Sequence, residues 1–447
     1  MSKIPKMLNQ KDAIGISVLR LGTHGSNKRV WITNKKLQEV FIPGEKVNIF
    51  YSKDSRQINL TRADLLGGDL TISKRGNGTP IIDLKNQEVE KTFGSGIQKI
   101  EVLFFKDEIV IKVAKTEKFK EKRAAKTGLN TFELFSGTGT LSSMFESIKG
   151  KNGEQFNVKG ALELNSDYLA MFHANHKNEE IFSINANLED IHSSYFPTDI
   201  DVVLSGIPCT SYSASNLKLK KAQKAKREGK QFDENEIAKE YQAEALTFYV
   251  LQAIKTMNPH TVVVEEVLEY SESPASMMLK TILSQMGYLI SEAVAEGTHT
   301  KRKRWVLVAN MGQKVDLNNL IKEDGKTIAD FLETSVDDRD WKSKEHFAPS
   351  RLNEKIGIRS STPTDIKTNT FTTHSTRGTE PILQKEKGVD LYSEFTNREI
   401  ANLHGLSHKF VLDKRKSIAR QCLGQGVTDA FKIVAERIIE ANKDSAA

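Results

Sequence analysis

The sequence predicts an α/β protein in which a doubly wound domain of alternating strands and helices follows a small β-rich domain. Two observations lead to this prediction. Residues 1 to about 115 alternate short β-like runs with turn signals. From Thr131 onward strand-like and helix-like segments alternate, and a tight glycine turn, Ser136-Gly-Thr-Gly-Thr140, joins the first strand to the first helix. At 447 residues the chain has room for two or three domains.

The composition is that of a globular protein whose positive charge is concentrated in two places. Hydrophobic residues make up 38% of the chain, and the formal net charge is +7. Seven lysine and arginine residues accompany one acid between Lys218 and Lys230, and six accompany two acids between Lys115 and Lys126. Such clusters attract phosphate backbones by releasing counterions. A solvated helix face is the alternative explanation of either run.

Membrane, secreted and metal-binding classes are not expected. No apolar run approaches the ~20 residues of a membrane helix. The segment Met1 to Lys6 lacks the apolar core of a secretory signal, so we expect a cytoplasmic protein. Cys209 and Cys422 lie far apart, with no C-x-x-C and no Cys/His cluster. Neither a disulfide framework nor a metal site is therefore predicted.

The first 115 residues form the predicted β-rich domain. Strands are expected at 16–21, 29–32 and 46–51, a helical segment at 35–40, and a hairpin at 97–105 and 108–113. The stretch from Ile16 to Leu60 resembles the swapped-hairpin DNA-binding domains of AbrB-type transcription factors. That resemblance would make Arg20, Lys28 and Arg29 phosphate contacts, and any small β-barrel is the competing interpretation. The charged segment that follows is expected to be a helical linker.

Candidate ligand-binding residues follow the first three strands of the second domain. The strand Phe132–Phe135 leads into the glycine turn, where the backbone can approach a ligand closely. A second strand, 158–164, ends in Glu163, in the position from which a carboxylate accepts hydrogen bonds from ribose hydroxyls. A third strand, 181–184, is followed by Asn187 and Asp190. A simple turn and solvent-facing strand-end residues are the alternative interpretation.

Cys209 follows a fourth, buried strand. The apolar run Val202-Val-Leu204 is broken by Ser-Gly-Ile-Pro, which places Cys209 on a loop beyond the carboxyl end of that strand. An exposed thiol with a depressed pKa is a nucleophile. The alternative is a small apolar residue in a turn. The basic stretch 216–230 and an amphipathic helix at 242–257 come next.

Two charged motifs accompany the remaining strands. Thr261-Val-Val-Val264 runs into Glu265-Glu266-Val267, and burial there would raise the pKa of Glu265 enough for it to donate a proton near neutrality. In an extended register Thr300, Arg302 and Arg304 share one face, which directs two guanidinium groups toward one anion or carbonyl. A basic edge strand is the alternative.

Taken in order, these motifs resemble those of the DNA (cytosine-5) methyltransferases. The glycine turn is similar to D-L-F-x-G-x-G, Gly206 to Ser213 to G-P-P-C-Q-x-F-S, Glu265 to Val267 to E-N-V, and Thr300 to Arg304 to Q-x-R-x-R. The segments 395–410 and 422–427 are similar to the two closing motifs of the family, with Arg398 and Glu399 implied to organise the target-recognition region. The chain departs from the family pattern at Glu133, Ile207, Glu266 and Thr300.

The resemblance implies a Rossmann-like domain that binds S-adenosyl-L-methionine. It implies Cys209 as the nucleophile, Glu265 as the group at N3 of cytosine, and Arg302, beside Arg304, as the group that holds the cytosine carbonyl. The cofactor contacts implied are Phe135, Ser136, Gly137, Thr138, Gly139, Thr140, Glu163, Leu164, Asn187, Pro208 and Gln425. The substrate contacts implied are Ser213, Lys218, Lys220, Lys221, Thr300 and Arg377.

We therefore expect a β-rich domain at 1–115, a basic linker at 116–129, a catalytic domain at 130–312, a target-recognition region at 313–394 and the rest of the catalytic domain at 395–447. The predicted reaction methylates C5 of a cytosine flipped out of double-stranded DNA, in a prokaryotic or phage-encoded enzyme that a restriction endonuclease would accompany in a restriction-modification system. The alternatives are a tRNA methyltransferase, which shares these motifs, a non-catalytic DNA-binding regulator, and an enzyme adapted to a modified base or donor. The oligomeric state is left open.

Overall fold

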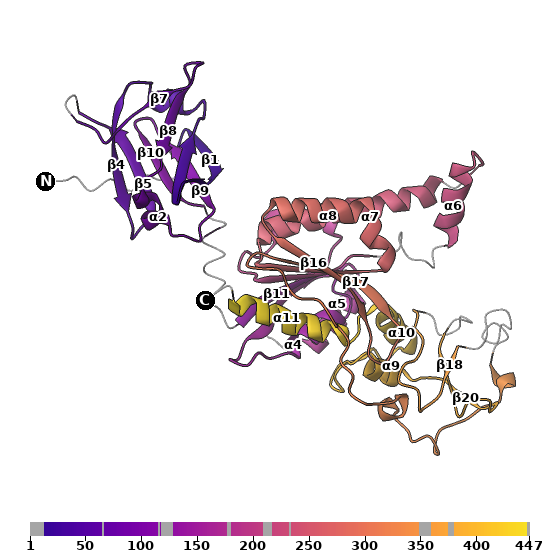
Figure 1. Ribbon diagram of the computed structural model, residues 1–447. Coiled ribbons are helices and arrows are strands. Elements are labelled where there is room, and N and C mark those ends of the chain that lie inside the picture. The colour runs from indigo at the N-terminus through magenta and orange to yellow at the C-terminus, as the bar shows by residue number, and fades with distance from the viewer. Residues whose placement is uncertain are drawn as a thin grey trace. The chain divides into compact units, whose positions relative to one another are not determined.

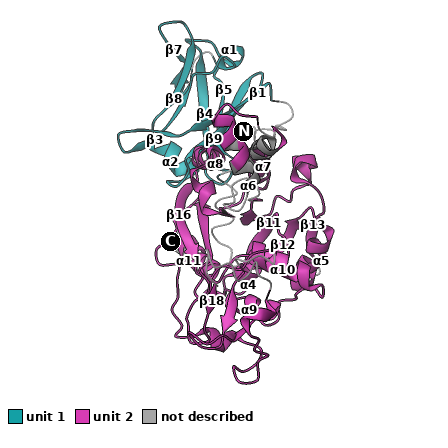
Figure 2. Ribbon diagram, turned by 90° about the vertical axis from the view of Figure 1, so that its right-hand side faces the viewer, with its two compact units in different colours: residues 1–123 teal, residues 124–447 magenta. Residues whose placement is uncertain are grey.

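The computed structural model divides into two compact units, residues 1–123 and 124–447, so the division falls within the segment expected to be a linker (Figure 2). The structure describes residues 13–64, 67–114, 117, 128–176, 180–208, 217–231, 234–347, 359–373 and 380–444. Most of the expected linker helix lies outside these residues.

The N-terminal unit contains two copies of one βββαββ arrangement. The first copy comprises β1 Gly15–Arg20, β2 Gly22–His24, β3 Asn27–Ile32, α1 Leu37–Val40, β4 Lys46–Ser52 and β5 Gln57–Arg62. The second comprises β6 Leu70–Thr71, β7 Ser73–Lys74, β8 Pro80–Leu84, α2 Gln87–Phe93, β9 Lys99–Phe104 and β10 Glu108–Val113. The β-rich character predicted from the sequence is confirmed.

The two copies exchange strands about an approximate two-fold axis. Leu19 of β1 lies opposite Ile100 of β9, and the equivalent Leu70 of β6 lies opposite Val47 of β4. On the axis itself equivalent strands pair with each other, β3 with β8 and β5 with β10, both antiparallel. The resulting sheets run β1-β9-β10-β5-β4-β6 and β2-β3-β8-β7. They share one core to which equivalent residues of both copies contribute, including Val30 with Ile82 and Phe41 with Phe93.

The second unit is built on a seven-stranded sheet in the order β13-β12-β11-β14-β15-β17-β16 (Figure 1). Its strands are β11 Gly128–Leu134, β12 Gln155–Leu162, β13 Phe182–Ile184, β14 Val202–Gly206, β15 Thr261–Glu266, β16 Leu289–Glu296 and β17 Lys303–Asn310. The first five of the order are parallel, and β17 is antiparallel to both of its neighbours. Strands β14 and β15 are rich in valine because both of their faces are buried.

Helices cover both faces of this sheet, as the doubly wound prediction requires. The α-helices in the described part of this unit are α4 Thr140–Glu146, α5 Ser166–Asn175, α6 Leu217–Arg227, α7 Glu234–Met257, α8 Pro274–Gln285, α9 Asn397–Leu403, α10 Lys416–Gln425 and α11 Ala430–Asp444. In Figure 1, α7 and α8 lie on one face and α4 and α11 on the other. Each face has its own apolar core, with Val262 and Val264 facing one and Val263 facing the other.

The region 313–394 has little regular structure, which agrees with its weak periodicity. Its described part holds the short strands β18 Ser360–Ser361, β19 Ile382–Gln384 and β20 Tyr392–Ser393 and short 3-10 turns. A buried ion pair ties it to α9, because both Arg339 terminal nitrogens donate to the Glu399 carboxylate, at 2.6 and 2.8 Å. The same carboxylate accepts from the backbone of Thr396 and closes a capping box at the start of α9.

Candidate active site

The candidate residues meet at one edge of the sheet. The carboxyl ends of β11 to β15 lie side by side there, and ligands of open α/β sheets bind at this edge. The glycine turn follows β11, Glu163 follows β12, Asn187 follows β13 and Pro208 follows β14. Glu265 is the penultimate residue of β15.

The turn after β11 has a backbone conformation that few sequences can adopt. Phe135, Gly137 and Gly139 all have positive φ angles of 56°, 52° and 81°. For Phe135 this conformation is strained, and such strain concentrates at functional sites. Gly139 is the N-cap of α4, so the turn delivers the chain directly into a helix N-terminus. The side chains of Ser136, Thr138 and Thr140 are buried, so the turn is packed against the fold.

Glu163 fixes this turn from the neighbouring strand. Its Oε2 accepts from the backbone N–H of Gly137 at 2.9 Å, and its Oε1 accepts from that of Asn165 at 2.8 Å. Leu164, the next residue, exposes 67% of its surface, which is unusual for an apolar side chain beside a buried sheet. A carboxylate anchored next to an exposed apolar side chain suits a nucleoside, which brings both ribose hydroxyls and an aromatic base. Asn187 caps a short 3-10 turn nearby and is partly buried, whereas Asp190 is exposed.

The C-terminal part of the chain reaches the same turn. A Cβ on Gly426 would lie 3.0 Å from Thr140 Cγ2, so the end of α10 packs directly on the start of α4. Gln425 is exposed beside this contact. Cys422, one turn earlier, is largely buried, and burial raises the pKa of its thiol to about 11. It is therefore an inert thiol in contrast to what the sequence predicts for Cys209.

Glu265 and Arg304 form an ion pair at the end of β15. Arg304 Nε lies 2.7 Å from Glu265 Oε1. Burial raises the pKa of Glu265, while Arg304 first and Arg302 second oppose that rise. A Cβ on Gly206 would lie 3.4 Å from Glu265 Oε2, so the carboxyl sits over the end of β14. The raised pKa expected from the sequence is thus found, and its physical cause is desolvation.

The two arginines of the motif both act on Glu265 through their charge, but they differ in their own hydrogen-bond partners. Strand β17 begins only at Lys303, so the extended register expected from Thr300 to Arg304 is interrupted before it. Arg302 is 2% exposed and donates to the backbone carbonyl of Phe371 at 3.5 Å. Thr300 is buried in a bridge to Thr368. Arg304 forms the ion pair with Glu265, and the charge of Arg302 also acts on that carboxyl.

Glu266 points away from this pair, as the alternation of a strand predicts. It is 1% exposed, and one of its oxygens accepts from the backbone N–H of Val267. Burial raises its pKa well above the usual range, and the charge of Glu265 raises it further. The residue that departs from the family pattern is thus a buried acid whose protonated form is favoured, and strand alternation places it on the opposite side of the sheet from Glu265.

Several predicted residues lie outside the described part of the chain. Cys209, Ser213 and Arg377 lie outside the described part, as do the side chains of Lys218 and Lys220. Pro208, the last described residue before the cysteine, is partly buried at the end of β14. Lys221 is exposed on α6, the helix that the basic stretch forms.

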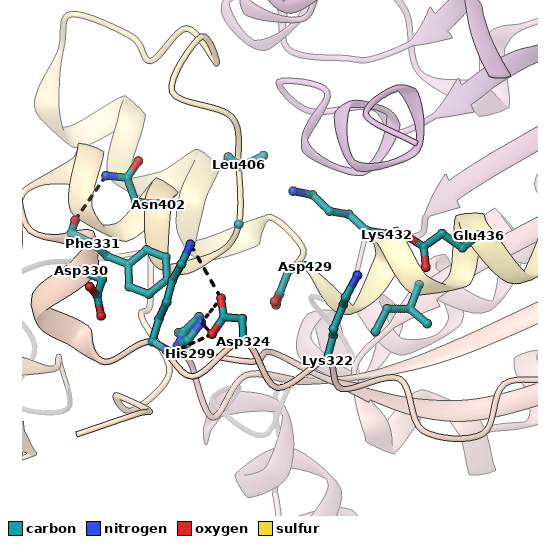
Figure 3. A pocket seen from close by; sticks show the side chains of 13 residues that line it. His299, Lys322, Asp324, Asp330, Phe331, Asn402, Leu406, Asp429, Lys432 and Glu436 are labelled. Carbon is teal, nitrogen blue, oxygen red and sulfur yellow. Dashed lines mark hydrogen bonds and ion pairs between the residues drawn. The ribbon is translucent and has the colours of Figure 1, made fainter. Parts of the chain in front are cut away.

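A separate cavity of about 440 Å³ lies between residues 322–331, the end of α9 and the start of α11 (Figure 3). Its lining is charged and includes Lys322, Asp324, Lys432 and Glu436. His299 at its base lies 3.2 Å from Asp324, and burial lowers the pKa of Lys432. Sequence patterns gave no sign of this cavity, because its walls come from three distant segments.

No group of three or more His, Cys, Asp or Glu side chains in the described ranges could hold a metal ion. Within those ranges, no helix is both long enough and apolar enough to cross a membrane.

Residues 129–440 match the family model of C-5 cytosine-specific DNA methylases. Among solved structures, the S. pombe Dnmt2 methyltransferase is similar with a TM-score of 0.52 and 18% identity, over 70% of this chain and 99% of that one. The Entamoeba histolytica methyltransferase EhMeth has a TM-score of 0.53 and 20% identity, over 71% and 99%. At these identities the likeness shows a shared fold. A search of curated protein sequences gives no match.

Proposed function

Because the chain belongs to the family of C-5 cytosine-specific DNA methylases, we propose that it methylates C5 of cytosine in double-stranded DNA. Like its family, it depends on S-adenosyl-L-methionine, which supplies an electrophilic methyl group when bound. The observation that carries the proposal is the Glu265–Arg304 ion pair at the carboxyl edge, on the same edge as the glycine turn and Glu163.

Different residues of the proposed cofactor site contact different parts of S-adenosyl-L-methionine. The glycine turn lets the backbone approach the amino-acid part closely. Glu163, anchored to Gly137 and Asn165, has its carboxylate in position for the ribose hydroxyls, and the exposed Leu164 covers one face of the adenine. Asn187 is the proposed partner of the adenine amino group. Gln425 closes the pocket from the end of α10.

Cys209 and Glu265 together activate the base. C5 of cytosine is a poor nucleophile, so the Cys209 thiolate adds to C6 while the protonated Glu265 carboxyl donates to N3. This addition gives C5 enamine character, and C5 takes the methyl group. Loss of the C5 proton then expels the thiolate and restores the aromatic ring. The raised pKa of Glu265 favours its protonated form, which this step requires.

Arg304 is assigned to the cytosine carbonyl. Its Nε orients Glu265, and the remaining nitrogens of its planar guanidinium can donate to a carbonyl beside the N3 that Glu265 contacts. Arg302, buried behind it, supports this geometry from the Phe371 carbonyl. The role that the sequence pattern gave to Arg302 is therefore proposed for Arg304.

The substrate must be flipped, because neither face of C6 is accessible in a stacked duplex. The segment after Cys209 continues into α6, whose described side chains Lys221, Lys224 and Lys226 lie on a solvent-exposed helix. Positive charge on an element next to the catalytic loop favours contact with phosphates. The recognition of a DNA sequence is assigned to the region 313–394, which joins α9 through the Arg339–Glu399 pair.

Transfer of tritium from methyl-labelled S-adenosyl-L-methionine tests the proposal, with mixed-sequence duplex DNA and a tRNA pool as competing substrates. We expect label in DNA as 5-methylcytosine, and none with Cys209→Ala. Label in tRNA alone would replace DNA by RNA as the substrate. Cofactor binding without transfer to either would refute the catalytic proposal.

A further inference from the structure

The end of α5 lies beneath the glycine turn and contacts it through two consecutive residues. His176 is 2% exposed, and its ring nitrogens are both engaged. Nδ1 lies 2.7 Å from Glu146 Oε2, and Nε2 lies 2.8 Å from Ser142 Oγ. Glu146 and Ser142 both belong to α4, the helix that starts at the turn. His176 therefore ties α5 to the helix that follows the cofactor turn.

The direction of these hydrogen bonds follows from the chemistry of the partners. The Glu146 carboxylate accepts, so Nδ1 carries the ring hydrogen. Nε2 then faces the Ser142 hydroxyl, which also donates to the Gly139 carbonyl at 3.3 Å. One imidazole thus makes two oriented bonds to one helix face, and this fixes the ring against the turn.

The turn itself is held at two successive residues. A Cβ on Gly139 would lie 2.5 Å from His176 Nε2, so the imidazole is in van der Waals contact with the backbone at Gly139. Asn175 Nδ2 donates to the Thr138 carbonyl at 3.1 Å. The same amide accepts from the backbone N–H of Val411 at 2.7 Å, in the segment between α9 and α10. Asn175 therefore joins the turn to the C-terminal part of the chain.

We propose that Asn175 and His176 form a clamp that holds the cofactor turn in its binding conformation, so that both residues set the affinity for S-adenosyl-L-methionine without touching it. The positive φ angles of Phe135, Gly137 and Gly139 give the physical need, because a strained turn persists only where its surroundings fix it. Preorganisation of this kind improves binding by lowering the cost of ordering the site. The inference rests on the cofactor of the proposed function and is independent of which nucleic acid is methylated.

Titration calorimetry of the full chain with S-adenosyl-L-methionine alone tests the clamp. His176→Ala and Asn175→Ala are each expected to raise the Kd about tenfold. His173→Ala is the matched control, because His173 is exposed on the same helix and its hydrogen bond goes to Ser183, at 3.0 Å. It is expected to leave the Kd unchanged.

The same titration separates a clamp from a general loss of folded protein. A misfolded fraction lowers the binding stoichiometry and leaves the Kd of the rest unchanged, whereas loss of the clamp raises the Kd at full stoichiometry. In methyl transfer, the clamp variants should show a raised KM for the cofactor with kcat within about twofold at saturation. Wild-type Kd values in both clamp variants would overturn the inference, whereas failure of the wild-type chain to bind the cofactor would overturn the proposed function instead.

A glycine pair provides an independent measurement. Gly139→Ala would drive a Cβ into the His176 ring, and Gly139 has a φ of +81°. Gly153→Ala has the same backbone penalty at φ +85° but meets nothing within 4 Å. We expect the first to weaken cofactor binding and the second to leave it unchanged. Equal Kd values for the two variants would contradict a role for the His176 contact.

Discussion

Two buried glutamates, Glu133 in β11 and Glu265 in β15, differ in what surrounds them. Glu133 lies next to Ser142, and the charged groups that act on it, Glu163 and Glu146, are acidic. Burial therefore raises its pKa to about 8, against a small opposing effect from Ser142. Glu265 is equally buried but lies 2.7 Å from the Arg304 guanidinium, which opposes the rise. The Glu133 carboxyl therefore has no cation among the described residues that favours its ionised form. The Glu265 carboxyl has such a cation beside it.

This difference shows how one sheet serves two purposes at one edge. The β11 side is held by bonds within the fold, through Glu163, Asn175 and His176, before any ligand arrives. The β15 side keeps an acid and a guanidinium together, and a base that offers N3 and a carbonyl would complete their hydrogen bonding. The proposed cofactor side is therefore preorganised by hydrogen bonds within the fold. The proposed substrate side holds a buried ion pair.

Glu265→Gln is expected to have the largest effect, because it removes the proton that the substrate side can supply. We expect kcat to fall by about 10² to 10⁴, the range of general acid catalysis, while the Kd for S-adenosyl-L-methionine stays unchanged. Single-turnover methyl transfer and calorimetry measure the two quantities. Glu266→Gln is the control, because strand alternation places that buried neighbour on the opposite side of the sheet. A matching loss in both variants would mean that the edge is structural.

Arg304→Gln should make Glu265 behave more like Glu133. The guanidinium favours the ionised carboxylate, so its removal raises the pKa of Glu265 further. The acid form is lost as pH rises through this pKa, so the alkaline limit of kcat should move to higher pH in the variant while the maximal rate falls. The pH profile of kcat checks this. A shift toward lower pH would show that another group sets the limit.

Glu133→Gln is expected to have the smallest effect on the reaction and a measurable one on stability. The folded-state pKa of about 8 lies above the unfolded value near 4.5, so the contribution of Glu133 to stability is complete below pH 4.5 and is lost as pH rises to about 8. The neutral amide removes this loss. At pH 8.5 the variant should be more stable than the wild type by up to a few kcal/mol, and at pH 4 about equal. Urea unfolding at both pH values measures the difference, and equal curves at pH 8.5 would show that Glu133 is already ionised.

The elements of the site that end strands could be predicted from local sequence. The glycine turn, Glu163 and Glu265 each follow an apolar run, and parallel strands bring their carboxyl ends together. The same logic placed Glu266 on the opposite side. It does not extend to Arg302, because alternation applies only inside a strand and β17 starts one residue later, so the role of that arginine stays a prediction.

The clamp and the repeated N-terminal architecture could not be found in this way. Asn175 and His176 contact residues more than thirty positions earlier, and neither belongs to a local pattern. The repeat left a weak signal, since Lys53-Asp54 and Lys106-Asp107 both form hairpin turns and Asn34 and Asn86 both precede helices. Among the equivalent core positions, Phe41 and Phe93 keep the residue type whereas Val30 and Ile82 differ, because an exchange of strands constrains burial and pairing more than the identity of each side chain. The AbrB-like assignment of this unit stays a prediction.

The exchange of strands in the N-terminal unit has a consequence for how it assembles. Neither half has a complete sheet of its own, because β1 requires β9 and β4 is bordered by β6. If the halves were separate molecules, their union would depend on protein concentration, as in a domain-swapped dimer. Joined in one chain, each half meets the other at an effective concentration in the millimolar range for short linkers. The N-terminal unit therefore behaves as a dimer that dilution cannot dissociate.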